Sequence, residues 1–269
     1  AIREKNLGPN NTLVALSIAN LGTNLSNQKR YDEAERLIKR ALAIREKVLG
    51  PQNLDVAASL HSLGWNYYYQ KRYDEAEPVE VRALKIREKA LGQNHIDVAI
   101  SLSDLADLYD TQQRFQESEA LYKRALLIKQ NISGSDHVGV AETLHNFADS
   151  LTNQRRYAEA EKLLKRSIEI KEKVFGINHP NTSFSLNDLA SIYMLQDRYG
   201  EGLEIVRLLM SKGKPEKYSA FPLLYKSKQR HLVSEKEAFA RSYNILQSAS
   251  TSAASEAVNQ LGQRYASGK

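Results

Sequence analysis

Apolar and small residues follow helical spacing along much of the chain, in segments separated by short polar turns. Residues 54–69 show this most clearly, because apolar or small side chains recur three or four positions apart. These positions are Val56, Ala57, Leu60, Leu63, Gly64 and Tyr67. A polar turn at 70–72 ends the segment, and a second amphipathic segment runs from Tyr73 to Lys89. The second segment begins with acidic residues, which the positive end of a helix favours. The pattern therefore predicts two helices joined by a tight turn.

This two-helix pattern recurs with a period of 42 residues. The segment Lys29–Glu35 is repeated letter for letter as Lys71–Glu77, and looser copies follow. Its aromatic residue falls at Tyr31, Tyr73, Phe115, Tyr157 and Tyr199, and a glycine follows each second helix at Gly50, Gly92, Gly134 and Gly176. A fixed period of this length indicates a stacked repeat array. We interpret the repeated segment as scaffold, and we expect the glycines to cap their helices in the αL conformation.

Large and small residues also alternate at fixed positions of each repeat, which lets antiparallel helices pack closely. The sequence Ala-Leu-x-Ile-Arg-Glu-Lys-x-Leu-Gly occurs at both 41–50 and 83–92. These features resemble the tetratricopeptide repeat, and the 42-residue period is similar to the kinesin-light-chain class of that family. The resemblance implies an all-α fold, a right-handed superhelix (α-solenoid) of antiparallel helix pairs with a C-terminal helical cap. The first helix of each pair would line a concave peptide-binding groove.

The repeat phase divides the chain into segments. We expect the end of a truncated preceding repeat at 1–11, repeats at 12–53, 54–95, 96–137 and 138–179, a degenerate fifth at 180–211, and a linker with capping helices at 212–269. Because residues 1–5 copy residues 43–47, we expect the chain to be part of a longer protein. Residues 252–268 resemble the junction between repeats and a caspase-like CHAT domain in bacterial proteins.

The formal net charge of +6 lies entirely in 212–269, because acidic and basic residues balance across 1–211. Lysines and aromatic residues alternate in that tail, a pattern that can stack on single-stranded nucleic acid. No recognition motif accompanies the charge, so we favour a solvated linker and regard nucleic acid as an unlikely partner. No run of about 18 apolar residues occurs, and a membrane is not an expected partner either.

Candidate catalytic chemistry is sparse. The chain has no cysteine, and it has no nucleophile elbow, phosphate-binding glycine loop or His-Glu-x-x-His motif. We therefore expect no enzyme activity, catalytic residue, cofactor or metal. His95, His137 and His179 share a repeat phase, but neighbouring repeat loops should lie about 10 Å apart. Ligands of one zinc ion lie about 2 Å from the metal, so we interpret these histidines as loop packing.

The groove is the best functional candidate. Carried over by phase, the positions implied by the resemblance begin in the first repeat with Leu16, Ala19, Thr23, Ser26 and Asn27. In the later repeats they include His61, Trp65, Tyr68, Tyr69, Ser103, Asp107, Asp110, Glu142, His145, Asp149 and Asn187.

Two features of these positions suggest a ligand. Trp65, the only tryptophan of the chain, gathers with Tyr68 and Tyr69 in one repeat, and aromatic residues of this kind often anchor partners. Acidic residues follow in the next repeats, with no lysine or arginine among them. We therefore predict a protein or peptide partner with a basic segment beside an apolar residue. Two alternatives remain open: the aromatics fill a tight superhelix, or the array regulates a CHAT protease domain outside this sequence. The oligomeric state is open as well.

Overall fold

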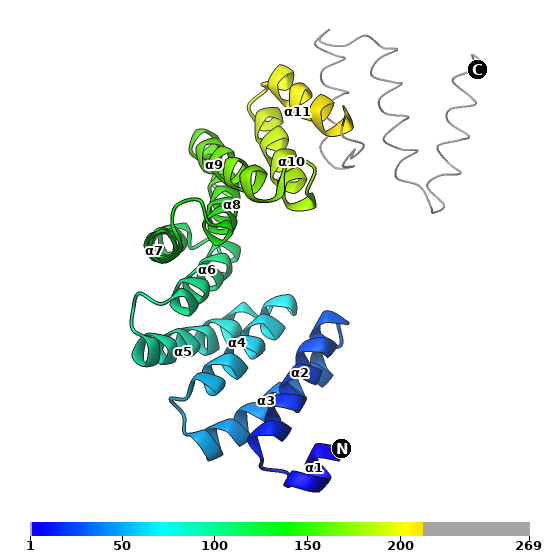
Figure 1. Ribbon diagram of the computed structural model, residues 1–269, viewed down its shortest axis with the longest axis vertical. Helices are drawn as coiled ribbons and strands as arrows, with labels where there is room; N and C mark the ends of the chain where they lie inside the picture. The colour runs from blue at the N-terminus through cyan, green and yellow to red at the C-terminus, as the bar shows by residue number, and fades with distance from the viewer. Residues whose placement is uncertain (1, 212–269) are drawn as a thin grey trace, which may run out of the picture. The chain divides into compact units, whose positions relative to one another are not determined.

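The computed structural model describes residues 2–211, and within them every regular element is an α-helix (Figure 1). The helices are α1 (Ile2–Leu7), α2 (Thr12–Asn27), α3 (Tyr31–Leu49), α4 (Leu54–Tyr69), α5 (Tyr73–Leu91), α6 (Ile96–Thr111), α7 (Phe115–Ser133), α8 (Val138–Asn153), α9 (Tyr157–Phe175), α10 (Pro180–Leu195) and α11 (Tyr199–Ser211). None of these helices is both long and apolar enough to cross a bilayer. The predicted capping helices, the basic tail and the CHAT-like segment lie outside the described residues.

The chain divides into two compact units. Unit 1 extends to Thr143, and unit 2 begins at Leu144, within α8. In unit 1, the helices from α2 to α7 pack against one another in chain order, and α2 also contacts α4 (Figure 1). In unit 2, α10 packs against both α9 and α11. The helices that open the pairs begin at the residues where repeats were expected to begin, namely Thr12, Leu54, Ile96, Val138 and Pro180. The predicted all-α fold of paired helices is therefore confirmed.

The turn inside each pair is a Schellman motif without glycine. After α4, Lys71 adopts a φ of 61°, and the backbone N–H of Arg72 donates to the carbonyl of Tyr67 at 2.9 Å. The same positive φ recurs at Lys29, Gln113, Arg155 and Asp197. This turn reverses the chain and delivers an arginine to the N-terminus of the next helix.

That arginine links consecutive repeats. Arg72 forms a bidentate pair with Glu75 of its own helix, at 2.6 and 2.7 Å, and its Nη1 donates to Glu35 of the preceding repeat at 2.6 Å. Its guanidinium also lies over the ring of Tyr67, 4.4 Å from the centroid. We call this arrangement the arginine staple. It recurs around Arg114 with Tyr109 and Glu77, and around Arg198 with Tyr193 and Glu161. The repeated sequence motif is therefore scaffold, as interpreted.

The glycines after the second helices differ from the expectation in one respect. Gly50, Gly92, Gly134 and Gly176 have φ of 82–84° but ψ of 157–162°, which is not the αL conformation. This region of φ and ψ is essentially restricted to glycine, because a Cβ atom would clash with the backbone. The need for glycine is therefore stricter here than at an αL cap.

The loop histidines are helix N-caps. His95 Nδ1 accepts a hydrogen bond from the backbone N–H of Asp97 at 3.1 Å, and His179 Nδ1 accepts from Asn181 at 3.2 Å. Asn53 occupies the same phase and caps α4 through its side-chain oxygen. A neutral imidazole nitrogen thus replaces an amide oxygen as the acceptor for a free helix N–H.

Candidate functional site

An open groove lies between the first helices of two consecutive repeats in unit 1. It has a volume of about 270 Å³ and is lined by Thr23, Ser26 and Asn27 of α2 and by His61, Ser62, Trp65, Asn66 and Tyr69 of α4. Six of these eight residues are positions that repeat phase assigned to the groove, the exceptions being Ser62 and Asn66. Asn66 is buried and donates to Ser26 Oγ at 2.6 Å and to the Tyr31 carbonyl at 3.3 Å, so it holds α4 against the preceding repeat.

Aromatic rings form one wall of the groove. The centroid of the Trp65 ring lies 5.1 Å from that of Tyr68 and 5.6 Å from that of Tyr69, and Tyr69 stacks at 6.4 Å on Tyr31. Trp65 and Tyr68 are half-buried, whereas Tyr69 is 54% exposed. The Trp65–Tyr68 contact is edge-to-face and the Tyr31–Tyr69 contact is stacked, and such contacts favour fixed ring orientations. The wall therefore presents aromatic surface that is already ordered.

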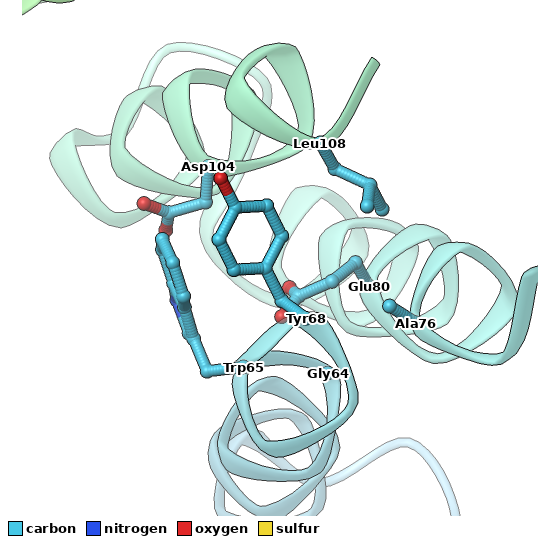
Figure 2. Close-up of a pocket in the computed structure, with 7 residues that line it drawn as sticks. All are labelled: Gly64, Trp65, Tyr68, Ala76, Glu80, Asp104 and Leu108. Carbon is cyan, nitrogen blue, oxygen red and sulfur yellow. The ribbon is translucent and has the colours of Figure 1, made fainter. Parts of the chain in front are cut away.

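A second, much smaller pocket is also lined by Trp65, together with Tyr68, Glu80 and Asp104. Figure 2 shows the carboxylates of Glu80 and Asp104 beside the rings of Trp65 and Tyr68. The space that these residues enclose is only about 10 Å³, enough for about one water molecule. It cannot receive a ligand side chain. Of the two pockets that Trp65 lines, only the groove is large enough for a ligand side chain.

Glu80 is a functional candidate that the sequence reasoning missed. It is only 5% exposed, and it occupies the phase at which the other repeats place Ile38, Tyr122 and Leu164. Its carboxylate lies against the backbone of α4, where a Cβ built on Gly64 would be 2.2 Å from Oε1. The signal was present, because a charged residue at a position of apolar phase requires a partner.

That partner is His61. Its Nδ1 lies 3.1 Å from Glu80 Oε2 and 3.9 Å from Asp104 Oδ2, so one imidazole of α4 faces carboxylates of α5 and α6. Burial lowers the pKa of His61, but the hydrogen bond to Glu80 and the two negative charges outweigh burial and raise it above 6.5. Burial raises the pKa of Asp104 to about 6, although the positive charge of His61 opposes the shift. The protonation of His61, which lines the groove, therefore depends on the carboxylates of Glu80 and Asp104.

The remaining predicted site residues of unit 1 are spread over α6 and α8. Asp107 accepts a hydrogen bond from the hydroxyl of Tyr122, Asp110 is half-buried, and Glu142 is exposed. Ser103 differs from the expectation, since it is buried and its hydroxyl donates to the Ala99 carbonyl at 3.1 Å. These acidic side chains do not line the aromatic groove.

In unit 2, the predicted residues fall into two groups. Asp149 is exposed, as a groove residue should be, whereas His145 and Asn187 are only 6% and 8% exposed. His145 contacts Ser185 of α10, and Asn187 donates to the Ser183 carbonyl of its own helix. Ser103, His145 and Asn187 are therefore buried and line no open groove, in contrast to His61, which occupies the same repeat phase and lines the groove of unit 1.

Comparisons with known proteins support the fold. A structure of the nearly identical TPR-like repeats of a Podosopora anserina protein described as a kinesin light chain has a TM-score of 0.66, at 23% identity over 76% of this chain and 96% of that one. BtubC (BKLC) from P. vanneervenii has a TM-score of 0.66, at 19% identity over 75% and 80%. A Rap protein complexed with competence and sporulation factor has a TM-score of 0.61, at 17% identity over 91% and 70%. At these identities the similarity shows the fold alone.

The family follows from a match to the sequence itself. No curated protein matches the chain. The model of the tetratricopeptide repeat, however, matches residues 11–89, 81–131, 97–173 and 139–207, which together span most of the sequence. The chain therefore belongs to the tetratricopeptide repeat family.

Proposed function

We propose that the protein is a partner-binding module that holds a segment of another protein in the groove between α2 and α4. The observation that carries the proposal is the aromatic wall, where the half-buried Trp65 and the exposed Tyr69 face a groove of about 270 Å³. That volume is sufficient for a large side chain. Exposed aromatic surface of this kind usually marks an interaction site, because its burial against a partner removes apolar area from water. The proposed role is binding and not catalysis.

The polar rim favours an extended segment. Asn27 and Thr23 are exposed on the α2 side, where an amide and a hydroxyl can bond to the main chain of a ligand. No lysine or arginine lines the groove. Asp107, Asp110 and Glu142 add negative charge elsewhere in unit 1, which favours a segment that carries lysine or arginine. The proposed ligand is therefore a basic segment with one apolar or aromatic residue, which packs against Trp65.

Membership of the tetratricopeptide repeat family supports a role in protein–protein interaction. Among the similar structures, the Rap protein is a complex with competence and sporulation factor, so a related fold does hold a ligand. The surface residues, and not the fold, decide which ligand is held. The basic and apolar preference proposed here rests on the side chains of this chain.

Tryptophan fluorescence tests the proposal directly, because Trp65 is the only tryptophan. Peptides of the form basic–aromatic–basic, and matched acidic peptides, would be titrated against the full chain. We expect a saturable change in Trp65 emission with the basic peptides only. Tyr69→Ala should weaken binding about tenfold, the loss of about 1.4 kcal/mol that a moderate anchor supplies.

The matched control is Leu127→Ala, which removes a side chain that is 59% exposed on the second helix of a repeat and away from the groove. This variant should bind like the wild type. Equal affinity for basic and acidic peptides would overturn the charge preference. Binding that is insensitive to Tyr69→Ala would overturn the groove itself.

A further inference from the structure

A histidine and two aspartates converge within unit 2. His145 and Asp149 lie one turn apart on α8, and Asp188 lies on α10. His145 Nε2 is 3.5 Å from Asp149 Oδ2 and 3.4 Å from Asp188 Oδ2. All three potential ligand atoms lie within 4.8 Å of one another, and among the described residues this is the one such group. The group is separate from the groove of unit 1.

The distances match those between ligands of a small divalent cation. Nitrogen and oxygen ligands lie about 2.0–2.2 Å from Zn²⁺ in tetrahedral geometry. The distance between two ligands of such a tetrahedron is about 3.3–3.5 Å, which agrees with both distances from His145 Nε2. Asp149 is 53% exposed at its side chain, so small rotations can bring its carboxylate into place. An imidazole with two carboxylates is also a donor set that Zn²⁺ accepts.

The other ring nitrogen of His145 is already held. Nδ1 lies 3.1 Å from Ser185 Oγ, and the Ser185 hydroxyl can donate to the Asn181 carbonyl at 3.3 Å. With the proton on Nδ1 donated to Ser185, the lone pair of Nε2 points toward the two carboxylates. Metal-binding histidines usually have such a partner on the second nitrogen, because it fixes the tautomer and the ring orientation.

Lys171 acts in two opposing ways. Its Nζ donates to Ser185 Oγ at 2.8 Å, so it strengthens the hydrogen bonds behind His145. The positive charge of Lys171 repels a second cation, and the carboxylates of Asp149 and Asp188 oppose this repulsion.

The equivalent positions in unit 1 show that this arrangement is not a general property of the repeat. His61 occupies the phase of His145, and Asp104 that of Asp188, but Trp65 stands where Asp149 would be. There the imidazole directs Nδ1 toward carboxylates, at 3.1 Å from Glu80 and 3.9 Å from Asp104, as in an ion pair. In unit 2 the corresponding residue to Glu80 is Leu164, so His145 has no such partner on the second helix.

We infer that His145, Asp149 and Asp188 form a binding site for a divalent cation of the Zn²⁺ type. Three protein ligands leave a fourth position for water or for a donor group of a bound partner. The site would link α8 to α10, and therefore two consecutive repeats of unit 2. It does not depend on the proposed role of the aromatic groove.

Calorimetric titration of the full chain with Zn²⁺ alone, at neutral pH, tests the inference. We expect one equivalent to bind, and Asp149→Asn, Asp188→Asn and His145→Gln each to weaken binding at least about tenfold. Asp149→Asn changes an exposed side chain, so it should fold normally even if His145→Gln does not. Substitution with Co²⁺ should give the strong visible absorption of tetrahedral cobalt, and this absorption should be lost in Asp149→Asn.

The matched control is His61→Gln, which removes the histidine of the same phase in unit 1. It should leave the Zn²⁺ affinity and the Co²⁺ spectrum unchanged. Absence of Zn²⁺ binding by the wild type would overturn the inference. So would wild-type affinity in Asp149→Asn and Asp188→Asn, since that result would assign binding to other histidines.

Discussion

At the scale of single residues, one repeat phase produces two different environments for histidine. His61 and His145 are equivalent by phase, yet the pKa of His61 is raised while that of His145 is lowered to about 4. The facing second helix accounts for the difference, because it presents Glu80 to His61 and Leu164 to the equivalent position in unit 2. The protonation behaviour of these two histidines is therefore set by Glu80, the residue that departs from the apolar repeat pattern.

The cluster around His61 should make the stability of unit 1 depend on pH. The charged groups that face it are Glu80 and Arg87 of α5, Asp104 of α6 and Lys129 of α7. The pKa of both His61 and Asp104 is higher in the folded chain than in an unfolded one, so the native state binds more protons. The stability from these groups is therefore present at low pH. The contribution of Asp104 is lost as pH rises through about 6, and that of His61 is lost only above 6.5.

Asp104→Asn should reduce this dependence, because a neutral amide does not lose a proton. At pH 7.5 we expect the free energy of unfolding of the variant to exceed that of the wild type by on the order of 1 kcal/mol or more. At pH 5 the difference between the two should be smaller. Urea unfolding followed by Trp65 fluorescence at both pH values measures the effect. Asp110→Asn on the same helix is the control, and a change at Asp104 that is identical at both pH values would contradict the assignment.

The close approach of Glu80 to α4 gives a second prediction at this scale. A methyl group at position 64 would lie 2.2 Å from Glu80 Oε1 and 2.7 Å from its Cδ, so the carboxylate must move away from His61. Gly64→Ala should therefore destabilise the chain by about 1–3 kcal/mol. In the double variant with Glu80→Ala the added cost should largely disappear. A cost for Gly64→Ala that is the same in both backgrounds would show that Glu80 is not the obstacle.

At the scale of helices and turns, the sequence predicts well what depends on periodicity. The helix starts, the buried tyrosines such as Tyr67 and Tyr193, and the scaffold role of the repeated motif follow from spacing alone. Features that are set by three-dimensional contacts cannot be predicted from the periodicity of the sequence. The ψ angles near 160° at glycines such as Gly92, and the capping role of His95, depend on backbone geometry that a periodic pattern does not encode.

The candidate site shows the same division between spacing and contact. Thr23 and Trp65 line one groove, because residues of equal repeat phase on stacked helices share a face. Repeat phase does not distinguish open positions from the closed seam that buries Ser103, since that difference depends on side-chain size and partners. The sequence does not single out Glu80, because acidic residues near the start of the second helix of a pair are explained by the helix dipole, which favours them there.

At the scale of the whole molecule, the arginine staples connect each helix pair only to its neighbour in the array. Each staple joins a helix pair to the pair before it, as Arg72 does with Glu35 and Arg198 with Glu161. In a repeat protein, stability is approximately a sum of the repeats and their nearest-neighbour interfaces. The loss of one staple should therefore loosen its own neighbourhood and leave distant repeats unchanged.

Two equivalent variants test this locality and serve as controls for each other. Arg72→Ala removes a bidentate pair, a link to the preceding repeat and a ring contact, so it should cost about 1–2 kcal/mol and speed hydrogen exchange about 5–30-fold in α3 to α5. Arg198→Ala should have the same effect in α9 to α11. Each variant should leave the exchange of the other region at wild-type rates.

If Arg72→Ala instead accelerated exchange in α10 as much as in α4, the array would unfold as one cooperative body, and the nearest-neighbour description would fail. Mass spectrometry of peptic fragments resolves these helices separately, so local and global loosening give distinct patterns.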